Sequence, residues 1–113
     1  MNIRINTIDH ITIINIIGEI NGETTRELQE HVLPKIRAGS GILLDMSHVK
    51  YLSSAGLRML LSMYRQQNRR LVLAGLSQEI HDMMSMTGFL KHFSVCPSVD
   101  AGIKALNQFK IED

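Results

Sequence analysis

Two periods of apolar residues alternate along the chain, and they predict strands in some segments and helices in others. Apolar and polar residues alternate over 3–8, and 10–17 is rich in Ile and Thr, whose branched side chains suit a pleated sheet. Asp9 and His10 lie between these two predicted strands and indicate a hairpin. The sequence over 18–22 then interrupts the pattern and predicts a turn.

Four segments carry apolar residues at every third or fourth position, which is the spacing of an amphipathic helix. They begin near Glu23, Ala55, Ser77 and Pro97. Pro34 falls inside the first of them and removes a backbone donor, so we expect this helix to kink or to run in two pieces.

Two short apolar runs, 41–45 and 71–74, predict strands that are buried on both faces, and 93–96 predicts a last short strand. The segment 47–52 is predicted to be a loop. Strands that alternate with helices are typical of the α/β class. We therefore expect a single domain over 1–113, with a mixed, mostly parallel sheet of four to five strands and about four helices, mainly on one face.

The composition narrows the possible functions. The 113 residues carry a net charge of +1, which gives no electrostatic footprint for nucleic acid. Cys96 is the one cysteine, so a disulfide framework and a multi-cysteine zinc site are excluded, and a reducing, cytoplasmic location is expected. The apolar runs are far shorter than the ~20 residues of a membrane helix, so no direct membrane insertion is expected.

The segment after the strand at 41–45 holds the main candidate site. Asp45 closes that predicted strand, and a helix opens near Ser53 and Ser54. A serine at this place most simply caps the helix, but a phosphate on it would lie where the helix dipole favours an anion. Arg58, one turn later, is placed to pair with that phosphate or with an acidic partner. Gly56 would allow either a tight helix start or the close approach of a partner.

The same segment resembles the signature of STAS domains, and specifically of bacterial anti-sigma factor antagonists. In that family an acidic or amide residue closes a buried strand, an apolar residue ends the next loop, and Asp or Ser, Ser, a small residue, Gly and Leu follow. The matching positions are Asp45, Leu52, Ser53, Ser54, Ala55, Gly56 and Leu57. Upstream, the sequence Gly-Glu-Ile-Asn over 18–21 resembles the family's Gly-Glu-Leu-Asp turn, and the resemblance extends over essentially the whole chain.

The resemblance implies a phosphorylation switch rather than an enzyme. An unphosphorylated antagonist binds an anti-sigma factor that is also a serine kinase of the histidine-kinase-like ATPase type, and so releases a sigma factor for transcription. Phosphorylation of Ser54 would end that binding, and a metal-dependent serine phosphatase would restore it. The chain itself would need no cofactor and no metal. The expected partner-binding residues are Ser53, Ala55, Gly56, Arg58, Asn21, Glu23 and Thr24.

Two positions depart from the family pattern. Ser53 and Asn21 stand where many members have Asp. Both changes remove negative charge near the presumed partner surface, and neither removes the acceptor hydroxyl of Ser54.

Two other function classes stay open on the sequence alone. One is a soluble STAS-type accessory subunit of a membrane transport complex. The other is a small hydrolase that uses Ser54 with Asp45 and His48, although the G-x-S-x-G nucleophile elbow is missing. The scattered histidines indicate solvated side chains rather than a metal site. Several methionines predict core packing or, as the alternative, an adaptable partner surface: Met59, Met63, Met83, Met84 and Met86.

Overall fold

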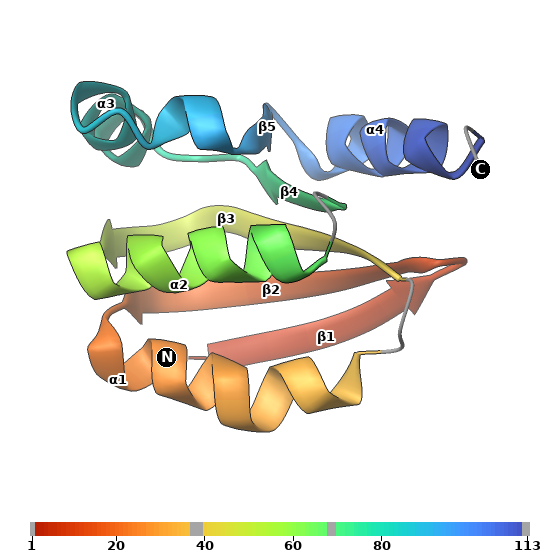
Figure 1. Ribbon diagram of the computed structural model, residues 1–113, viewed down its shortest axis with the longest axis horizontal. Coiled ribbons are helices and arrows are strands. Elements are labelled where there is room, and N and C mark those ends of the chain that lie inside the picture. Colours follow the sequence, from red (N-terminus) through yellow and green to blue (C-terminus); the bar gives the residue numbers. More distant parts are fainter. Residues whose placement is uncertain (1, 37–39, 68–69, 112–113) are drawn as a thin grey trace.

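A five-stranded sheet lies at the centre of the computed structural model, which describes residues 2–36, 40–67 and 70–111 (Figure 1). The strands follow one another across the sheet in chain order. The first two form an antiparallel hairpin, and the remaining neighbours are parallel, so the predicted mixed, mostly parallel sheet is confirmed. The strands are β1 (Asn2–Ile8), β2 (Ile11–Ile20), β3 (Gly41–Leu52), β4 (Leu71–Ala74) and β5 (Ser94–Cys96).

The helical segments follow the strands as the periodicity predicts. The first helical run is divided, as expected from Pro34, which lies in a terminal 3-10 turn where its missing donor costs little. Before that turn the run passes from α-helix into a π-helical turn. The segments are α1 (Gly22–Glu27), η1 (Leu28–Val32), η2 (Leu33–Lys35), α2 (Ser54–Gln66), α3 (Gln78–Met86), η3 (Leu90–His92) and α4 (Val99–Ile111).

Each face of the sheet has its own apolar core, because successive side chains of a strand point to opposite faces. Ile14 and Leu44 belong to the larger core, which the first helical run, α2 and α3 cover. Ile13 and Leu43 belong to the smaller core on the other face, where Leu106 of α4 packs. In Figure 1, α2 lies on the near side of β2 and β3. The prediction of helices mainly on one face is therefore confirmed.

The predicted loop over 47–52 is wrong, because β3 continues without interruption to Leu52. β2 likewise continues to Ile20, through the first part of the predicted turn. Two register shifts between these strands break the simple alternation of buried and exposed residues, and Gly18 at one of them has a positive φ of 122°. The irregular pattern that indicated a loop is thus the pattern of a bulged strand.

The predicted role of the methionines is confirmed for three of them. Met59, Met63 and Met84 are buried in the larger core. Met83 packs against that core from a partly exposed position. For Met86 the prediction of core packing is wrong, because this residue is 88% exposed.

Asp45 lies within β3 rather than at its end, and it links β3 to β2. Its Oδ2 accepts a hydrogen bond of 2.8 Å from the Asn15 side chain, and its Oδ1 accepts one of 2.7 Å from the Ser47 hydroxyl. Burial alone would raise the pKa of Asp45, but these hydrogen bonds outweigh it and hold the pKa below its ordinary value. The carboxylate is therefore favoured over the neutral acid in the folded chain.

This link predicts a specific loss of stability in acid. Because the folded pKa of Asp45 is lowered, its contribution is complete above the ordinary pKa of about 4 and is lost as the pH falls through the folded value. The free energy of unfolding, measured with urea between pH 5 and pH 2.5, should fall more steeply in the wild type than in Asp45→Asn. Parallel pH profiles for the two proteins would contradict this account.

Candidate functional site

The first turns of α1 and α2 lie side by side at the end of the sheet. β2 and β3 end in register, with Ile20 opposite Leu52, and each strand leads directly into a helix (left side of Figure 1). The Ser53 N–H donates to the Ile20 carbonyl at 2.8 Å, which joins the two connections. A Cβ placed on Gly22 would lie 3.9 Å from the Cβ of Ala55. We call the surface formed by residues 21–24, 53–55 and 58 the helix-start face.

Asn21 is the N-cap of α1. Its Oδ1 accepts from the backbone N–H groups of Glu23 and Thr24, at 3.0 and 3.1 Å. The Thr24 hydroxyl in turn accepts from the Asn21 N–H at 2.7 Å, which completes a reciprocal capping box. Asn caps as well as Asp does, so the sequence departure at this position preserves the helix start while it removes a charge.

The two neighbouring serines have different environments. The Ser53 hydroxyl accepts from the Gly56 N–H at 3.1 Å, so Ser53 is the N-cap of α2. Ser54 is the first residue of the helix and is exposed. Within the described ranges, the Ser54 hydroxyl has no hydrogen-bond partner from the chain. The sequence leaves open which of the two serines caps the helix, and the structure shows that it is Ser53. Ser54 presents a free hydroxyl to solvent.

Gly56 has a packing role in the structure. It is buried, and an added Cβ would lie 2.8 Å from Leu52 Cδ1 and about as close to both the side chain and the backbone carbonyl of Ile20. The missing side chain lets α2 approach the ends of β2 and β3. Its neighbours Ser54 and Ala55 are exposed.

Arg58 bends back along α2 toward Ser54. Its Nε–H donates to the Ser54 carbonyl at 3.4 Å, and both side chains are exposed. Glu23 is exposed on the neighbouring first turn of α1. The structure thus brings together every predicted partner-binding residue, with Gly56 beneath the surface and the others on it.

The proposed hydrolase triad is not formed. Asp45, His48 and Ser54 are spread along the length of β3 and into α2, rather than crowded into one loop. At about 3.3 Å per strand residue, Asp45 lies roughly 23 Å from Leu52, where β3 ends before α2. The Asp45 carboxylate is bound to Asn15 and Ser47, so it cannot orient a base beside Ser54.

A hollow lies beside the second half of β3. The sequence does not predict it, because the pattern over 47–52 indicates a loop rather than a strand. β4 pairs with β3 only as far as Asp45, so the rest of β3 lies beside the start of α3. The hollow has a volume of about 520 Å³ and is lined by Ile17, Ser47, His48, Val49, Lys50, Ser77, Gln78 and Glu79.

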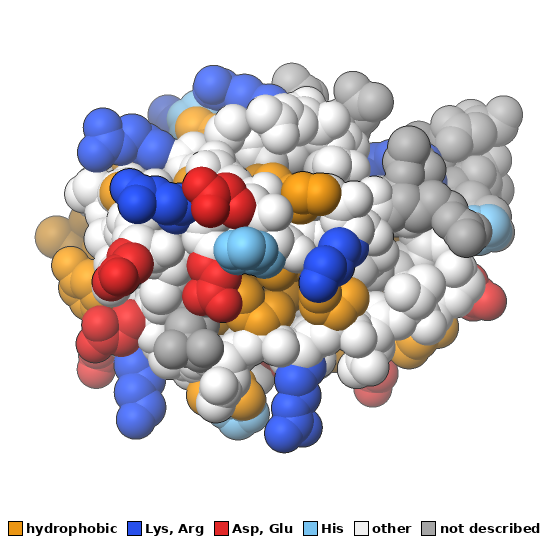
Figure 2. Space-filling model, turned by 90° about the horizontal axis from the view of Figure 1, so that it is seen from below, with side chains coloured by type: hydrophobic (Ala, Val, Ile, Leu, Met, Phe, Trp, Pro, Cys, Tyr) orange, Lys and Arg blue, Asp and Glu red, His pale blue; other side chains and the backbone are white. Residues whose placement is uncertain are grey.

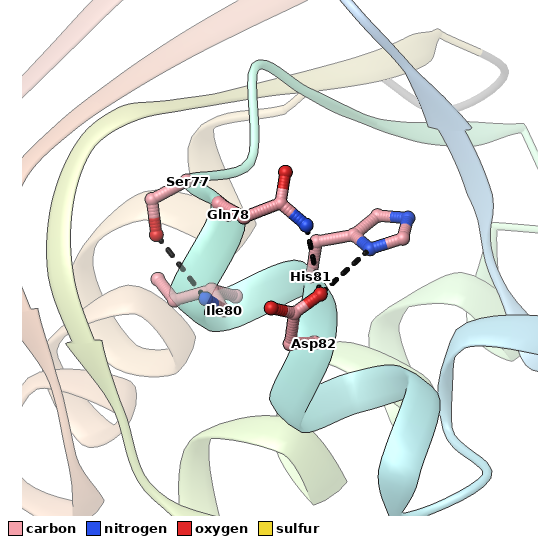
Figure 3. Close-up of polar contacts among 5 residues, drawn as sticks. All are labelled: Ser77, Gln78, Ile80, His81 and Asp82. Carbon is pink, nitrogen blue, oxygen red and sulfur yellow. Dashed lines mark hydrogen bonds and ion pairs between the residues drawn. The ribbon is translucent and has the colours of Figure 1, made fainter.

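The start of α3 carries a small polar cluster (Figure 3). Ser77 caps the helix by accepting from the Ile80 N–H at 3.2 Å. Gln78 donates to the Asp82 carboxylate at 2.8 Å, and His81 lies 3.8 Å from the same oxygen. These groups satisfy one another on the exposed side of the helix.

The charged surface is mixed in sign. Figure 2, which views the molecule from below Figure 1, shows acidic and basic side chains interspersed on that face. Among the residues that the structure describes, no group of three His, Cys, Asp or Glu side chains could hold a metal ion. No helix in the described ranges is long and apolar enough to cross a membrane.

Comparison with known proteins identifies the family. The model of the STAS domain matches residues 2–102, which is most of the chain. The chain belongs to the STAS domain family. The matched residues include both helix starts that form the helix-start face.

Several similar proteins are named as anti-sigma factor antagonists. A Bordetella bronchiseptica protein assigned as anti-sigma factor antagonist BtrV is 29% identical over 109 residues, covering 93% of this chain and 94% of that protein. The anti-sigma-B factor antagonist of Listeria monocytogenes is 31% identical over 84 residues, covering 71% and 73%. The crystal structure of an anti-sigma factor antagonist from Mycobacterium paratuberculosis shares the fold, with a TM-score of 0.82, 20% identity and coverage of 94% and 93%.

Gly56 provides a test of how the helix-start face is built. Gly56→Ala should lower the free energy of unfolding by about 1–3 kcal/mol, because the added methyl group meets the Ile20 backbone as well as two core side chains. Gly22→Ala is the matched control on the other helix start, since its added methyl group meets Ala55 at ordinary contact distance, and it should change stability by less than about 0.5 kcal/mol. Equal effects in urea unfolding would contradict the packing role of Gly56.

Proposed function

We propose that this STAS domain is an anti-sigma factor antagonist in a partner-switching pathway. In its unphosphorylated form it binds an anti-sigma factor that is also a serine kinase of the histidine-kinase-like ATPase type. Phosphorylation of Ser54 releases it, and a metal-dependent serine phosphatase returns it to the binding form. It acts in the cytoplasm as a binding protein rather than an enzyme. The observation that carries the proposal is the free, exposed hydroxyl of Ser54 beside a serine that is already used as the helix cap.

The division between the two serines favours Ser54 as the acceptor. A kinase that modified Ser53 would have to break the cap of α2, which stabilises a helix by about 1 kcal/mol. A phosphate on Ser54 needs no such rearrangement. It would also lie at the positive end of the helix dipole, so the fold tolerates the modification.

The same position makes the phosphate effective against a partner. Ser54 begins α2 on the helix-start face, next to Ala55, whose side chain lies beside Gly22 of α1. A phosphate there adds nearly two negative charges and several strongly hydrated oxygens to a surface that a partner must desolvate. A partner surface that fits the unmodified face would then have to bury the charge of the phosphate, which costs binding free energy. The two states therefore differ in affinity without a change in fold.

Binding to the kinase tests this proposal directly. The kinase captured from cells of the source organism should bind the wild type and Ser54→Ala alike, and should bind the domain with phosphoserine at 54 about 30- to 150-fold more weakly. Calorimetric titration gives both dissociation constants. Incubation with the kinase and ATP should place one phosphate on Ser54, located by mass spectrometry.

Ser53→Ala is the control for this experiment. It loses the cap of α2 but keeps the acceptor, so it should still take the phosphate at Ser54. Phosphate on another residue, or equal affinity before and after phosphorylation, would contradict the proposal. Capture of membrane transporter subunits in place of a kinase would favour the accessory-subunit function instead.

A further inference from the structure

The Arg58 side chain lies over the first turn of α2, close to where a phosphate on Ser54 would lie. Its Nε–H already points back to the Ser54 carbonyl, at 3.4 Å. Residues four apart on a helix are surface neighbours, with about 5–6 Å between their Cβ atoms. Both side chains are exposed, so no packing has to be broken when a phosphate enters the space between them.

Arg58 also has no competing carboxylate nearby on its own helix. The first turn of α2 contains no acidic residue, and the described part of the chain gives Arg58 no ion pair. Ser53, which precedes the acceptor, is neutral and already occupied by the Gly56 N–H. The charged groups on the adjacent helix α1 are Glu23 in its first turn, which would repel a phosphate, and Arg26 and Glu27 in its last turn.

We infer that Arg58 binds the phosphate of Ser54 within the same chain and holds it as a dianion against the first turn of α2. This inference rests on the proposed function only in taking Ser54 as the phosphate acceptor. The planar guanidinium presents two parallel N–H donors to two phosphate oxygens, which a lysine cannot do. Arg58 is thus a positioning residue for the switch.

The contact changes the helix-start face in two ways at once. The phosphate gains a fixed position over the face instead of rotating freely around the Ser54 side chain. The guanidinium, which in the unmodified domain is available to an acidic partner, is taken up by the phosphate. One modification therefore adds an anion to the face and withdraws a cation from it.

The second ionisation of the phosphate measures this contact. Phosphoserine is placed at 54 by genetic code expansion, so that no kinase is needed, and the ³¹P resonance is followed from pH 4.5 to 8 at 0.15 M salt. A free phosphoserine has a second pKa of about 6. The midpoint in the wild type should lie roughly 0.2–0.7 pH unit below that in Arg58→Gln, as expected for an exposed charge pair.

Two further variants separate the contact from a general effect of charge. Arg65→Gln removes the same charge about 16 Å along α2 from Ser54, and should leave the midpoint at the wild-type value. Arg58→Lys keeps the charge but loses the two-donor geometry, and should give an intermediate midpoint. In the wild type, the Arg58 Nε–H resonance should shift with the same midpoint as the phosphate.

Equal midpoints in the wild type and Arg58→Gln, or an Nε–H resonance that does not respond, would overturn the inference. The urea unfolding of unmodified Arg58→Gln should match that of the wild type, which shows that the variant is folded. The proposed function is tested separately, by the affinity of the kinase for the domain with phosphoserine at 54. If phosphate releases the kinase from Arg58→Gln as strongly as from the wild type and the ³¹P midpoints agree, the switch stands and the role of Arg58 fails.

Discussion

The parallel pairing of β2 with β3 over their full lengths is the constraint on which the rest of the structure depends. The pairing continues through two register shifts until Ile20 lies opposite Leu52. Because both strands then lead directly into helices, the first turns of α1 and α2 are fixed beside each other, and the Ser53 N–H bond to the Ile20 carbonyl joins them. The helix-start face is thus built from two segments that are some thirty residues apart in the sequence.

Similar residues on this surface have different structural roles, which their local hydrogen bonds and packing determine. Asn21 and Ser53 each satisfy the backbone donors of one helix, and Gly56 gives α2 the space to approach the strands. These roles leave the Ser54 hydroxyl exposed and outside the hydrogen bonds that hold the two helix starts. A phosphate added there would change the charge of the helix-start face without breaking those bonds.

Much of the fold could be predicted from the sequence, because local patterns and tertiary packing agree in most segments. The short apolar runs became β3 and β4, and Pro34 marked the division of the first helical run. The second half of β3 could not be predicted, since bulges in the β2–β3 pairing remove the period by which a strand is recognised. The exposure of Met86 could not be predicted, because the number of methionines leaves open whether each one packs in the core or lies on the surface.

The residues of the candidate site could be predicted from the sequence, but their positions and hydrogen bonds could not. The signature located Ser53, Ser54 and Gly56, whereas only the structure shows which serine is the cap and that the glycine is buried. Adjacent serines look alike in a sequence because the difference lies in one backbone hydrogen bond. The apparent triad of Asp45, His48 and Ser54 failed for the same reason as the predicted loop, since a strand separates residues that a loop would have gathered.

The most direct test of the central claim is an NMR map of the surface that the kinase covers. Amide resonances of the ¹⁵N-labelled domain would be compared with and without the unlabelled kinase, before and after phosphorylation of Ser54. We predict that the changes centre on residues 21–24 and 53–58 in the unmodified domain and disappear in the phosphorylated one. Changes centred on α4, or on the hollow between β3 and α3, or changes that persist after phosphorylation, would contradict the account.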